Sequence, residues 1–232
     1  MIFAGLQKLT LLDYPEHTAC TVFTQGCDFR CPFCHNSSLL DTAAAPENPV
    51  TEEEILSFLN KRRGTLDGVC VTGGEPLLHP GLRGFMQRVR EMGFKVKLDT
   101  NGNHPASLRA LIDEGLLDMV AMDIKNCPAH YARTVGVPGF DIGPVRESAS
   151  LLMEGRVPYE FRTTVTRELH SAEDMRAIGA WLRGDSAYYL QLYVDSGHVL
   201  RPGLSAPTAE EMRAYRELLL PYLPRTQIRG LD

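Results

Sequence analysis

The sequence predicts an α/β fold in which a parallel sheet, curved into a partial barrel, carries helices on its outer side. Two observations support this prediction. Short apolar runs alternate with amphipathic segments along most of the 232-residue chain, and polar or glycine-rich clusters follow directly after the apolar runs. Strands that are each followed by a helix give a parallel sheet, because each crossover returns the chain to the same strand direction.

Six short runs have the composition of strands. They are partly β-branched and are bounded by Gly, Pro, Asn or Asp, which favours extended structure over helix. The predicted strands are residues 18–24, 68–72, 95–100, 119–124, 159–165 and 188–194.

Six amphipathic segments lie between and after these strands, and they have apolar residues at helical spacing. Three of them open with a Ser or Thr that is followed three positions later by an acidic residue, a capping signal that marks a helix start. The predicted helices are residues 51–63, 81–92, 105–114, 144–154, 171–183 and 208–220. The capping pairs are Thr51 with Glu54, Ser171 with Asp174, and Thr208 with Glu211.

Composition and charge narrow the class of protein. A hydrophobic share of 44% and a charged share of 23% are typical of globular proteins, and the length suits one domain over residues 1–232. A net charge of −5 argues against a broad basic surface for nucleic acid. No apolar run approaches the length of a membrane span, and the N-terminus lacks the pattern of a signal peptide. We therefore expect a cytoplasmic protein that binds neither nucleic acid nor membranes.

The clusters that follow the strands predict where a ligand binds. In a parallel sheet the carboxyl ends of the strands share one edge, and ligands gather there. Each cluster alone could be simple loop punctuation, but five of them fall at this edge. They are residues 27–34, 73–76, 99–102, 123–125 and 195–198.

The first cluster contains three cysteines, Cys27, Cys31 and Cys34, within eight residues. In a cytosolic chain such a group indicates metal binding rather than disulfides. One loop of this kind can wrap three corners of a cubane cluster, which leaves the fourth iron free for a substrate. Zinc is the alternative with His35 as a fourth ligand, but adjacent residues rarely reach one tetrahedral ion. Cys70 and Cys127 are distant in sequence and stay open as ligands.

A second motif follows the second predicted strand and contains Gly73, Gly74, Glu75 and Pro76. The glycines allow a close backbone approach, Glu75 offers an acceptor to a cationic group, and Pro76 stiffens the exit. A tight turn between strand and helix is the structural alternative.

The cysteine spacing, with the aromatic Phe33 directly before Cys34, resembles the signature of the radical S-adenosylmethionine (SAM) superfamily. This resemblance implies a partial (β/α)6 TIM-like barrel of the radical SAM type. It also implies a [4Fe–4S] cluster on the three cysteines, Phe33 against SAM, and a GGEP motif that binds the SAM amino group.

The resemblance implies that two further clusters form a polar wall that faces SAM. The structural alternative is that they are only a turn and a surface ion pair. They comprise Asp99, Thr100 and Asn101 after the third predicted strand, and Asp123 and Lys125 after the fourth. In some related activating enzymes the matching aspartates and threonine hold a monovalent cation, which makes Asp99, Thr100 and Asp123 candidates here. Lys125 would face SAM or the substrate.

Arg162 lies within the fifth predicted strand, where a charged residue points either to solvent or to a ligand inside the barrel. An inward Arg162 would pair with the SAM carboxylate. His198 follows the sixth predicted strand and is a further candidate SAM contact, and Gln191 could point inward. Cys70 is expected to pack in the core, and Cys127 is expected to be either a thiol in a loop without a role in the site or a residue near the site.

Strings along the chain, from Gly-Leu-Gln-Lys-Leu-Thr near the start to Phe-Arg-Thr-Thr-Val at residues 161–165, resemble the activating proteins of anaerobic ribonucleoside-triphosphate reductases, close to pyruvate formate-lyase activating enzymes. The resemblance implies an enzyme that cleaves SAM reductively and leaves a glycyl radical on a partner enzyme, with flavodoxin or ferredoxin as electron donor. Two alternatives remain. One is a radical SAM enzyme that acts on a small molecule, such as a 7-deazapurine synthase, and the other is a non-enzymatic zinc or iron–sulfur module.

Overall fold

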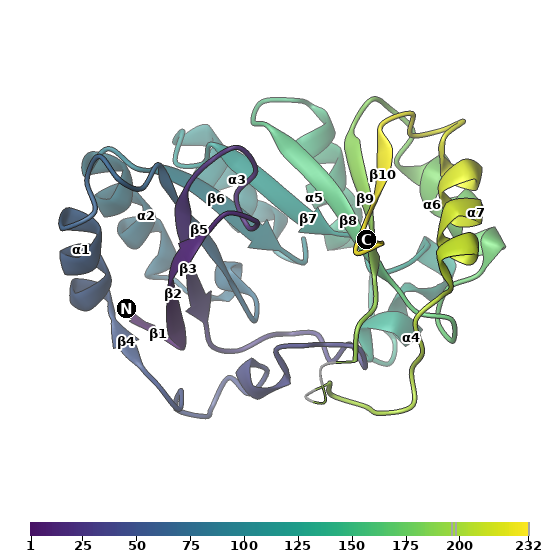
Figure 1. Cartoon of the computed structure of the whole chain (residues 1–232), viewed down its shortest axis with the longest axis horizontal. Coiled ribbons are helices and arrows are strands. Elements are labelled where there is room, and N and C mark those ends of the chain that lie inside the picture. Colours follow the sequence, from purple (N-terminus) through teal and green to yellow (C-terminus); the bar gives the residue numbers. More distant parts are fainter. Residues whose placement is uncertain (196, 198, 232) are drawn as a thin grey trace.

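An eight-stranded sheet forms the centre of the protein in a computed structural model that describes residues 1–195, 197 and 199–231 (Figure 1). The strand order is β10-β9-β8-β7-β6-β5-β3-β2, and every neighbouring pair is parallel except β2 with β3. The strands are β2 (Gly5–Thr10), β3 (Ala19–Thr24), β5 (Gly68–Gly73), β6 (Lys95–Thr100), β7 (Met119–Asp123), β8 (Tyr159–Val165), β9 (Ala187–Leu192) and β10 (Thr226–Arg229).

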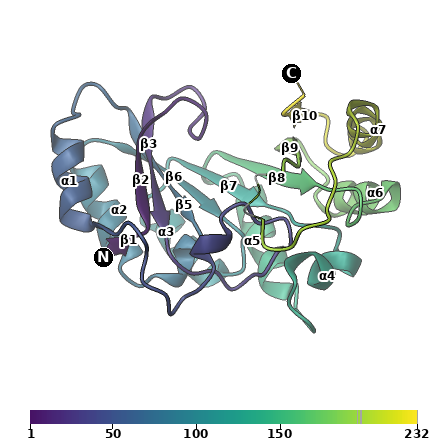
Figure 2. The ribbon, with the colours of Figure 1, turned by 60° about the horizontal axis from the view of Figure 1, so that its bottom comes forward.

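Helices surround the outside of this curved sheet, with α1 and α2 near one edge and α6 and α7 near the other (Figures 1 and 2). The α-helices are α1 (Glu52–Asn60), α2 (Leu82–Glu91), α3 (Pro105–Asp113), α4 (Tyr131–Val135), α5 (Gly143–Met153), α6 (Ala172–Trp181) and α7 (Ala209–Leu219). The short 3-10 helices are η1 (Ser37–Leu39), η2 (Pro76–Leu78) and η3 (Pro128–His130), and β1 (Ile2–Phe3) pairs with β4 (Val50–Thr51). Among the described residues no helix is long and apolar enough to cross a membrane.

The predicted elements are confirmed in type and order. All six predicted strands belong to the parallel part of the sheet, and each predicted helix is present within a few residues of its expected bounds. The capping boxes that begin α1, α6 and α7 form as the sequence indicated. Two edge strands, β2 and β10, were not predicted. They lie at opposite edges of the sheet and do not pair with each other, so the barrel stays open.

The two faces of the sheet have opposite character. On β6, Val96 and Leu98 are fully buried in the apolar core, whereas Lys97 and Asp99 belong to a polar interior. Successive side chains of a strand point to opposite faces, so this alternation separates a helix-facing core from a barrel lining. The lining faces the loop that follows β3, which runs across the carboxyl ends of the strands (Figure 2).

Candidate active site

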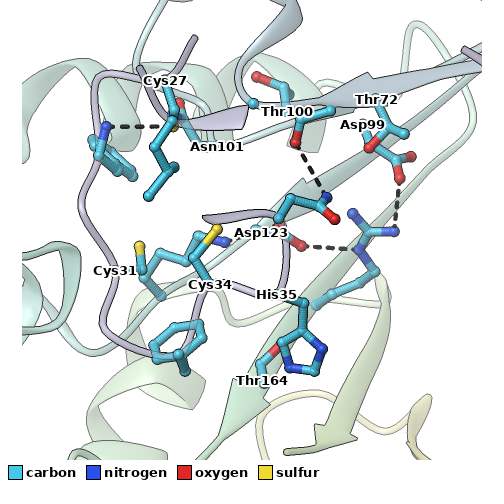
Figure 3. Close-up of a pocket in the computed structure, with 18 of the residues that line it drawn as sticks. Cys27, Cys31, Cys34, His35, Thr72, Asp99, Thr100, Asn101, Asp123 and Thr164 are labelled. Carbon is cyan, nitrogen blue, oxygen red and sulfur yellow. Dashed lines mark hydrogen bonds and ion pairs between the residues drawn. The ribbon is translucent and has the colours of Figure 1, made fainter. Parts of the chain in front are cut away.

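The three cysteines of the loop after β3 line one cavity of about 350 Å³ at the carboxyl ends of β5–β9. Cys27 and Cys31 are buried, and Cys34 is half-buried. Figure 3 shows the three cysteine side chains with Asp123 near Cys34, and His35 next to Cys34, which it follows on the same loop. All six cysteines of the chain are free thiols, so the three sulfur atoms are available to a metal cluster.

Backbone hydrogen bonds hold this loop in place. Cys27 N donates to Leu40 O at 3.2 Å, and Arg30 N donates to Val135 O at 2.8 Å. Gly73 and Gly74 are needed because the chain passes very close to the loop. A Cβ at Gly74 would lie 1.9 Å from Gly26 O, and one at Gly73 would lie 2.2 Å from Thr24 N. The glycines therefore let the end of β5 lie directly against the end of β3 and the start of the loop that carries Cys27.

The three cysteines would be protonated when no metal is bound, and they would become thiolates on binding the iron ions of a cluster. Burial raises the pKa of Cys27 and of Cys31 to about 12, and it also raises the pKa of Cys34. A thiolate in this environment needs a bound cation to replace its proton. Three such thiols on one loop fit three corners of a [4Fe–4S] cluster. His35 packs edge-on against Tyr193, with the ring centroids 5.8 Å apart.

Glu75 is fully buried behind the cavity wall rather than in it. Its carboxylate accepts hydrogen bonds from Leu77 N at 3.0 Å, Thr100 Oγ1 at 2.8 Å and Asn101 N at 2.7 Å. Burial raises its pKa to about 7, although these three donors oppose the rise. Glu75 thus ties the loop after β5 to the loop after β6. Pro76 begins η2 and does not line the cavity either.

Asp28, inside the cysteine motif, connects the cluster loop to the loop after β6. Its carboxylate accepts hydrogen bonds from Asn101 Nδ2 at 2.8 Å and Asn103 Nδ2 at 2.6 Å, and it lies 3.0 Å from His104 Nε2. Burial by itself would raise the pKa of Asp28, but these partners lower it to about 2, and Asp28 raises the pKa of His104. Sequence reasoning missed Asp28, Asn103 and His104 because their role depends on two loops meeting.

Charged residues of β6, β7 and β8 form the floor of the cavity. Arg162 joins both aspartates, with Nε 2.9 Å from Asp123 Oδ1 and Nη1 3.1 Å from Asp99 Oδ2. Lys125 Nζ donates to Asp123 Oδ2 at 3.0 Å, and Lys97 Nζ pairs with Asp99 Oδ1. Arg162 is inward, as predicted. The sequence analysis predicted the other four charged residues of this floor but not Lys97.

The pKa directions agree with these ion pairs. Burial opposes ionisation of Asp123, yet Arg162 and Lys125 outweigh it and hold the pKa of Asp123 at about 2. The pKa of Asp99 is lowered in the same way by Arg162 and Lys97. Burial would lower the pKa values of Lys125 and Arg162, but the aspartates raise both instead. Asp99, Asp123, Lys125 and Arg162 are therefore charged at neutral pH.

The predicted monovalent cation does not fit these residues. Each of the four carboxylate oxygens of Asp99 and Asp123 already accepts a hydrogen bond from a cationic nitrogen. The Thr100 hydroxyl donates to Glu75 and accepts from Gly102 N at 3.1 Å. A cation of this kind needs oxygen ligands with little positive charge nearby, whereas each of these carboxylate oxygens already faces a cationic nitrogen.

Most predicted site residues converge on the cavity. Its lining includes Cys27, Cys31, Phe33, Cys34, Gly73, Gly74, Asp99, Thr100, Asn101, Asp123, Lys125, Arg162 and Gln191. Lys125 Nζ lies 5.9 Å from the centroid of the Phe33 ring. Thr164 and Asn36 also line the cavity and had not been singled out. His198 lies outside the described residues.

The other two cysteines that were considered as ligands lie away from this lining. Cys70 is buried, with its sulfur 3.8 Å from Lys97 Nζ. Cys127 Sγ and His130 Nδ1 lie 3.0 Å and 2.7 Å from Asp174 Oδ1, outside the cavity. The other oxygen of Asp174 accepts from Ser171 in the capping box of α6. Cys127 and His130 therefore share one oxygen of Asp174, and the other oxygen caps the start of α6.

Comparison with known proteins agrees with this geometry. Residues 21–168 match the family model of the Radical SAM superfamily. A putative glycyl-radical enzyme activating enzyme of Methanocaldococcus jannaschii is 27% identical over 237 residues, which is 100% of this chain and 97% of the relative. A 7-carboxy-7-deazaguanine synthase of Methanopyrus kandleri is 30% identical over 196 residues, which is 75% of this chain and 73% of the relative.

The fold is shared with solved structures. Streptococcus suis SuiB bound to S-adenosylmethionine superposes with a TM-score of 0.68 at 14% identity, covering 89% of this chain and 48% of that one. A partial α/β barrel with three loop cysteines around a polar cavity defines a class of iron–sulfur enzymes. Because the family match covers more than half of the chain, the protein belongs to the radical SAM superfamily, whose members use a [4Fe–4S] cluster and SAM.

Proposed function

We propose that the protein is an activating enzyme that cleaves SAM reductively and generates a glycyl radical on a partner enzyme, an anaerobic ribonucleoside-triphosphate reductase. The observation that carries the activating-enzyme part of this proposal is the similarity to the putative glycyl-radical enzyme activating enzyme of M. jannaschii along the whole length of both chains. The reductase as partner is what the resemblance of the sequence strings implies. The open sheet supports it, because β2 and β10 do not pair and leave one side of the barrel unclosed. A glycine loop of a second protein needs such an opening.

The residues of the cavity take distinct roles in this proposal. Cys27, Cys31 and Cys34 hold the cluster, which when bound and reduced supplies the electron that breaks the bond between the SAM sulfur and C5′. Arg162 presents its guanidinium to the SAM carboxylate. Phe33 provides an apolar surface beside the cluster loop. The cleavage would release methionine and leave a 5′-deoxyadenosyl radical, which would take a hydrogen atom from the Cα of the partner's glycine to give 5′-deoxyadenosine and the glycyl radical.

The loops that follow β5 and β6 position SAM. The Gly73–Gly74 turn lines the cavity and presents its backbone to the SAM amino group. Thr100 and Asn101 face the same space, and Glu75 holds both of them from behind. We therefore assign Glu75 and Pro76 to the support of this wall. We also propose that one domain over residues 1–232 carries out this function. The proposed electron donor is a flavodoxin or a ferredoxin.

A small-molecule substrate is the second candidate function. The M. kandleri 7-carboxy-7-deazaguanine synthase favours it, since it matches three quarters of this chain at 30% identity. Both reactions begin with the same cleavage of SAM, so the cavity floor serves either one. A pyruvate formate-lyase as partner is a further alternative that differs only in the identity of the glycyl radical enzyme.

The test combines anaerobic reconstitution with a partner assay. The protein is loaded with iron and sulfide, reduced with dithionite and incubated with SAM, and 5′-deoxyadenosine is measured by chromatography. We expect deoxyadenosine from the wild-type protein and none from Cys31→Ala, which should fold without an intact cluster. Adding a purified anaerobic ribonucleotide reductase should give a glycyl radical signal in electron paramagnetic resonance spectra. Deoxyadenosine without that signal, but with turnover of a deazapurine precursor, would favour the second function.

A further inference from the structure

Lys97 is a buried lysine that the proposed reaction does not itself require. Its side chain is only 1% exposed, and its ammonium pairs with Asp99 Oδ1 from below the cavity floor. The other oxygen of Asp99 accepts from Arg162 Nη1 at 3.1 Å. A charge is buried at this depth only with a partner, because desolvation of an unpaired ammonium is very costly. Lys97 therefore fixes Asp99, and Asp99 in turn fixes Arg162.

The charges around this group do not cancel. Lys97, Arg162 and Lys125 contribute three positive charges, whereas Asp99 and Asp123 contribute two negative ones. The next acidic group on β8, Glu160, is neutralised separately by two hydrogen bonds of 2.9 Å from Arg229. Counted over these five groups, the floor carries one surplus positive charge before a ligand arrives, and Asp13 is a further acidic group whose charge acts on the Cys70 thiol beside Lys97. An added alkali cation would be repelled, and an added carboxylate would be attracted.

We propose that Lys97 supplies, as part of the chain, the positive charge that a bound monovalent cation would otherwise provide beside the SAM carboxylate. SAM binding and cleavage by this protein then need no alkali cation. The inference rests on the proposed function, in that SAM places its carboxylate at Arg162. Lys97 is a positioning residue, since it acts through Asp99 and does not line the cavity.

The experiment compares buffers in which choline is the only cation with buffers of equal ionic strength that contain K⁺ or NH4⁺. The dissociation constant of SAM and the rate of deoxyadenosine formation are measured for the reconstituted protein. For the wild type we expect both values to agree within about twofold in all buffers. For Lys97→Met we expect SAM to bind about tenfold more weakly in choline, with recovery in K⁺ or NH4⁺, because a small cation can enter the space beside Asp99.

Lys95→Met is the matched control. Lys95 begins the same strand and has the same charge, but its side chain is exposed at the opposite end of the barrel and contacts His17. This variant should bind SAM as the wild type does in every buffer. Any effect that it shares with Lys97→Met would come from net charge rather than from the position of Lys97.

Thermal unfolding without SAM gives a second measurement that does not depend on the proposed function. K⁺ should raise the melting temperature of Lys97→Met and leave that of the wild type unchanged relative to choline. In the double variant Lys97→Met, Asp99→Asn the effect of K⁺ should vanish, because the carboxylate that lost its lysine partner is no longer present. A wild type that requires K⁺, or a Lys97→Met defect that neither ion repairs, would overturn the inference. Failure of the wild type to cleave SAM in any buffer would instead count against the proposed function.

Discussion

Replacing Gly74 with alanine is expected to displace the cluster loop, because the two backbones are almost in contact. An added Cβ would lie 1.9 Å from Gly26 O and 2.6 Å from Gly26 C. Both of these atoms belong to the backbone, and neither can rotate away as the end of a flexible side chain can. Gly26 also accepts a hydrogen bond from Glu75 N at 2.8 Å, and it directly precedes the first cluster ligand, Cys27.

The size of the effect follows from this distance. Non-bonded carbon and oxygen atoms need more than 3 Å, so the loop has to move by on the order of 1 Å. Overpacking of this kind costs about 3 kcal/mol, and loss of the Glu75–Gly26 hydrogen bond adds about 1 kcal/mol. Displaced ligands and their supports weaken metal binding by roughly tenfold to a hundredfold. We therefore expect Gly74→Ala to unfold at a lower temperature and to retain little cluster.

Gly84→Ala is the control for this substitution. Gly84 lies within α2, and nothing is found within 4 Å of an added Cβ there. Alanine is favoured over glycine in the interior of an exposed helix by about 1 kcal/mol, so this variant should be more stable and should bind iron normally. Melting temperatures and iron and sulfide contents are measured for both variants after anaerobic reconstitution. A Gly74→Ala protein with full iron content and an unchanged melting temperature would refute the reasoning.

Two further substitutions test the supports around the site. Asp28 has a native pKa of about 2 against an ordinary value of 3.8, so its stabilising effect is complete above about pH 4 and is lost as the pH falls toward 2. Asp28→Asn should lower the free energy of unfolding by about 2 kcal/mol at pH 7, and urea titrations at decreasing pH should show the gap to the wild type narrowing. Thr208→Ala removes the cap of α7, so thermal unfolding should show a loss of about 1 kcal/mol; a change in SAM cleavage by this variant would contradict the placement of α7 outside the site.

Local patterns were enough to predict the six central strands and the helices. The capping box of α6, for example, depends only on Ser171 and Asp174 in one turn, and the structure forms it as expected. The edge strands were missed for physical reasons. β2 (Gly5–Thr10) is largely exposed and pairs on one side only, and β10 (Thr226–Arg229) has four residues. Neither shows the continuous apolar run that marks a buried parallel strand.

The candidate site was predictable where a motif brings its own residues together and not where separate segments meet. The three cysteines lie within eight residues of one another after β3, and Gly73 and Gly74 are adjacent at the end of β5. The place of each group at the cavity follows from its own strand. Glu75 was expected in the cavity, yet the donors of Thr100 and Asn101 hold its carboxylate behind the wall. Its position depends on the contact between two loops, and this contact is not encoded in the spacing of either motif.

The polar interior explains how a single lysine can influence the reaction site. Parallel strands are usually apolar on both faces, whereas here Lys97 and Asp99 on β6 and Arg162 on β8 form a chain of ion pairs inside the barrel. Each of these charges is stable inside the barrel only through the next one. Arg162, the last cation of this series, lines the cavity. It shares Asp99 with Lys97 and Asp123 with Lys125. Because one positive charge remains uncompensated, an anionic group of the ligand completes the series, and the affinity for that group depends on residues that never touch it.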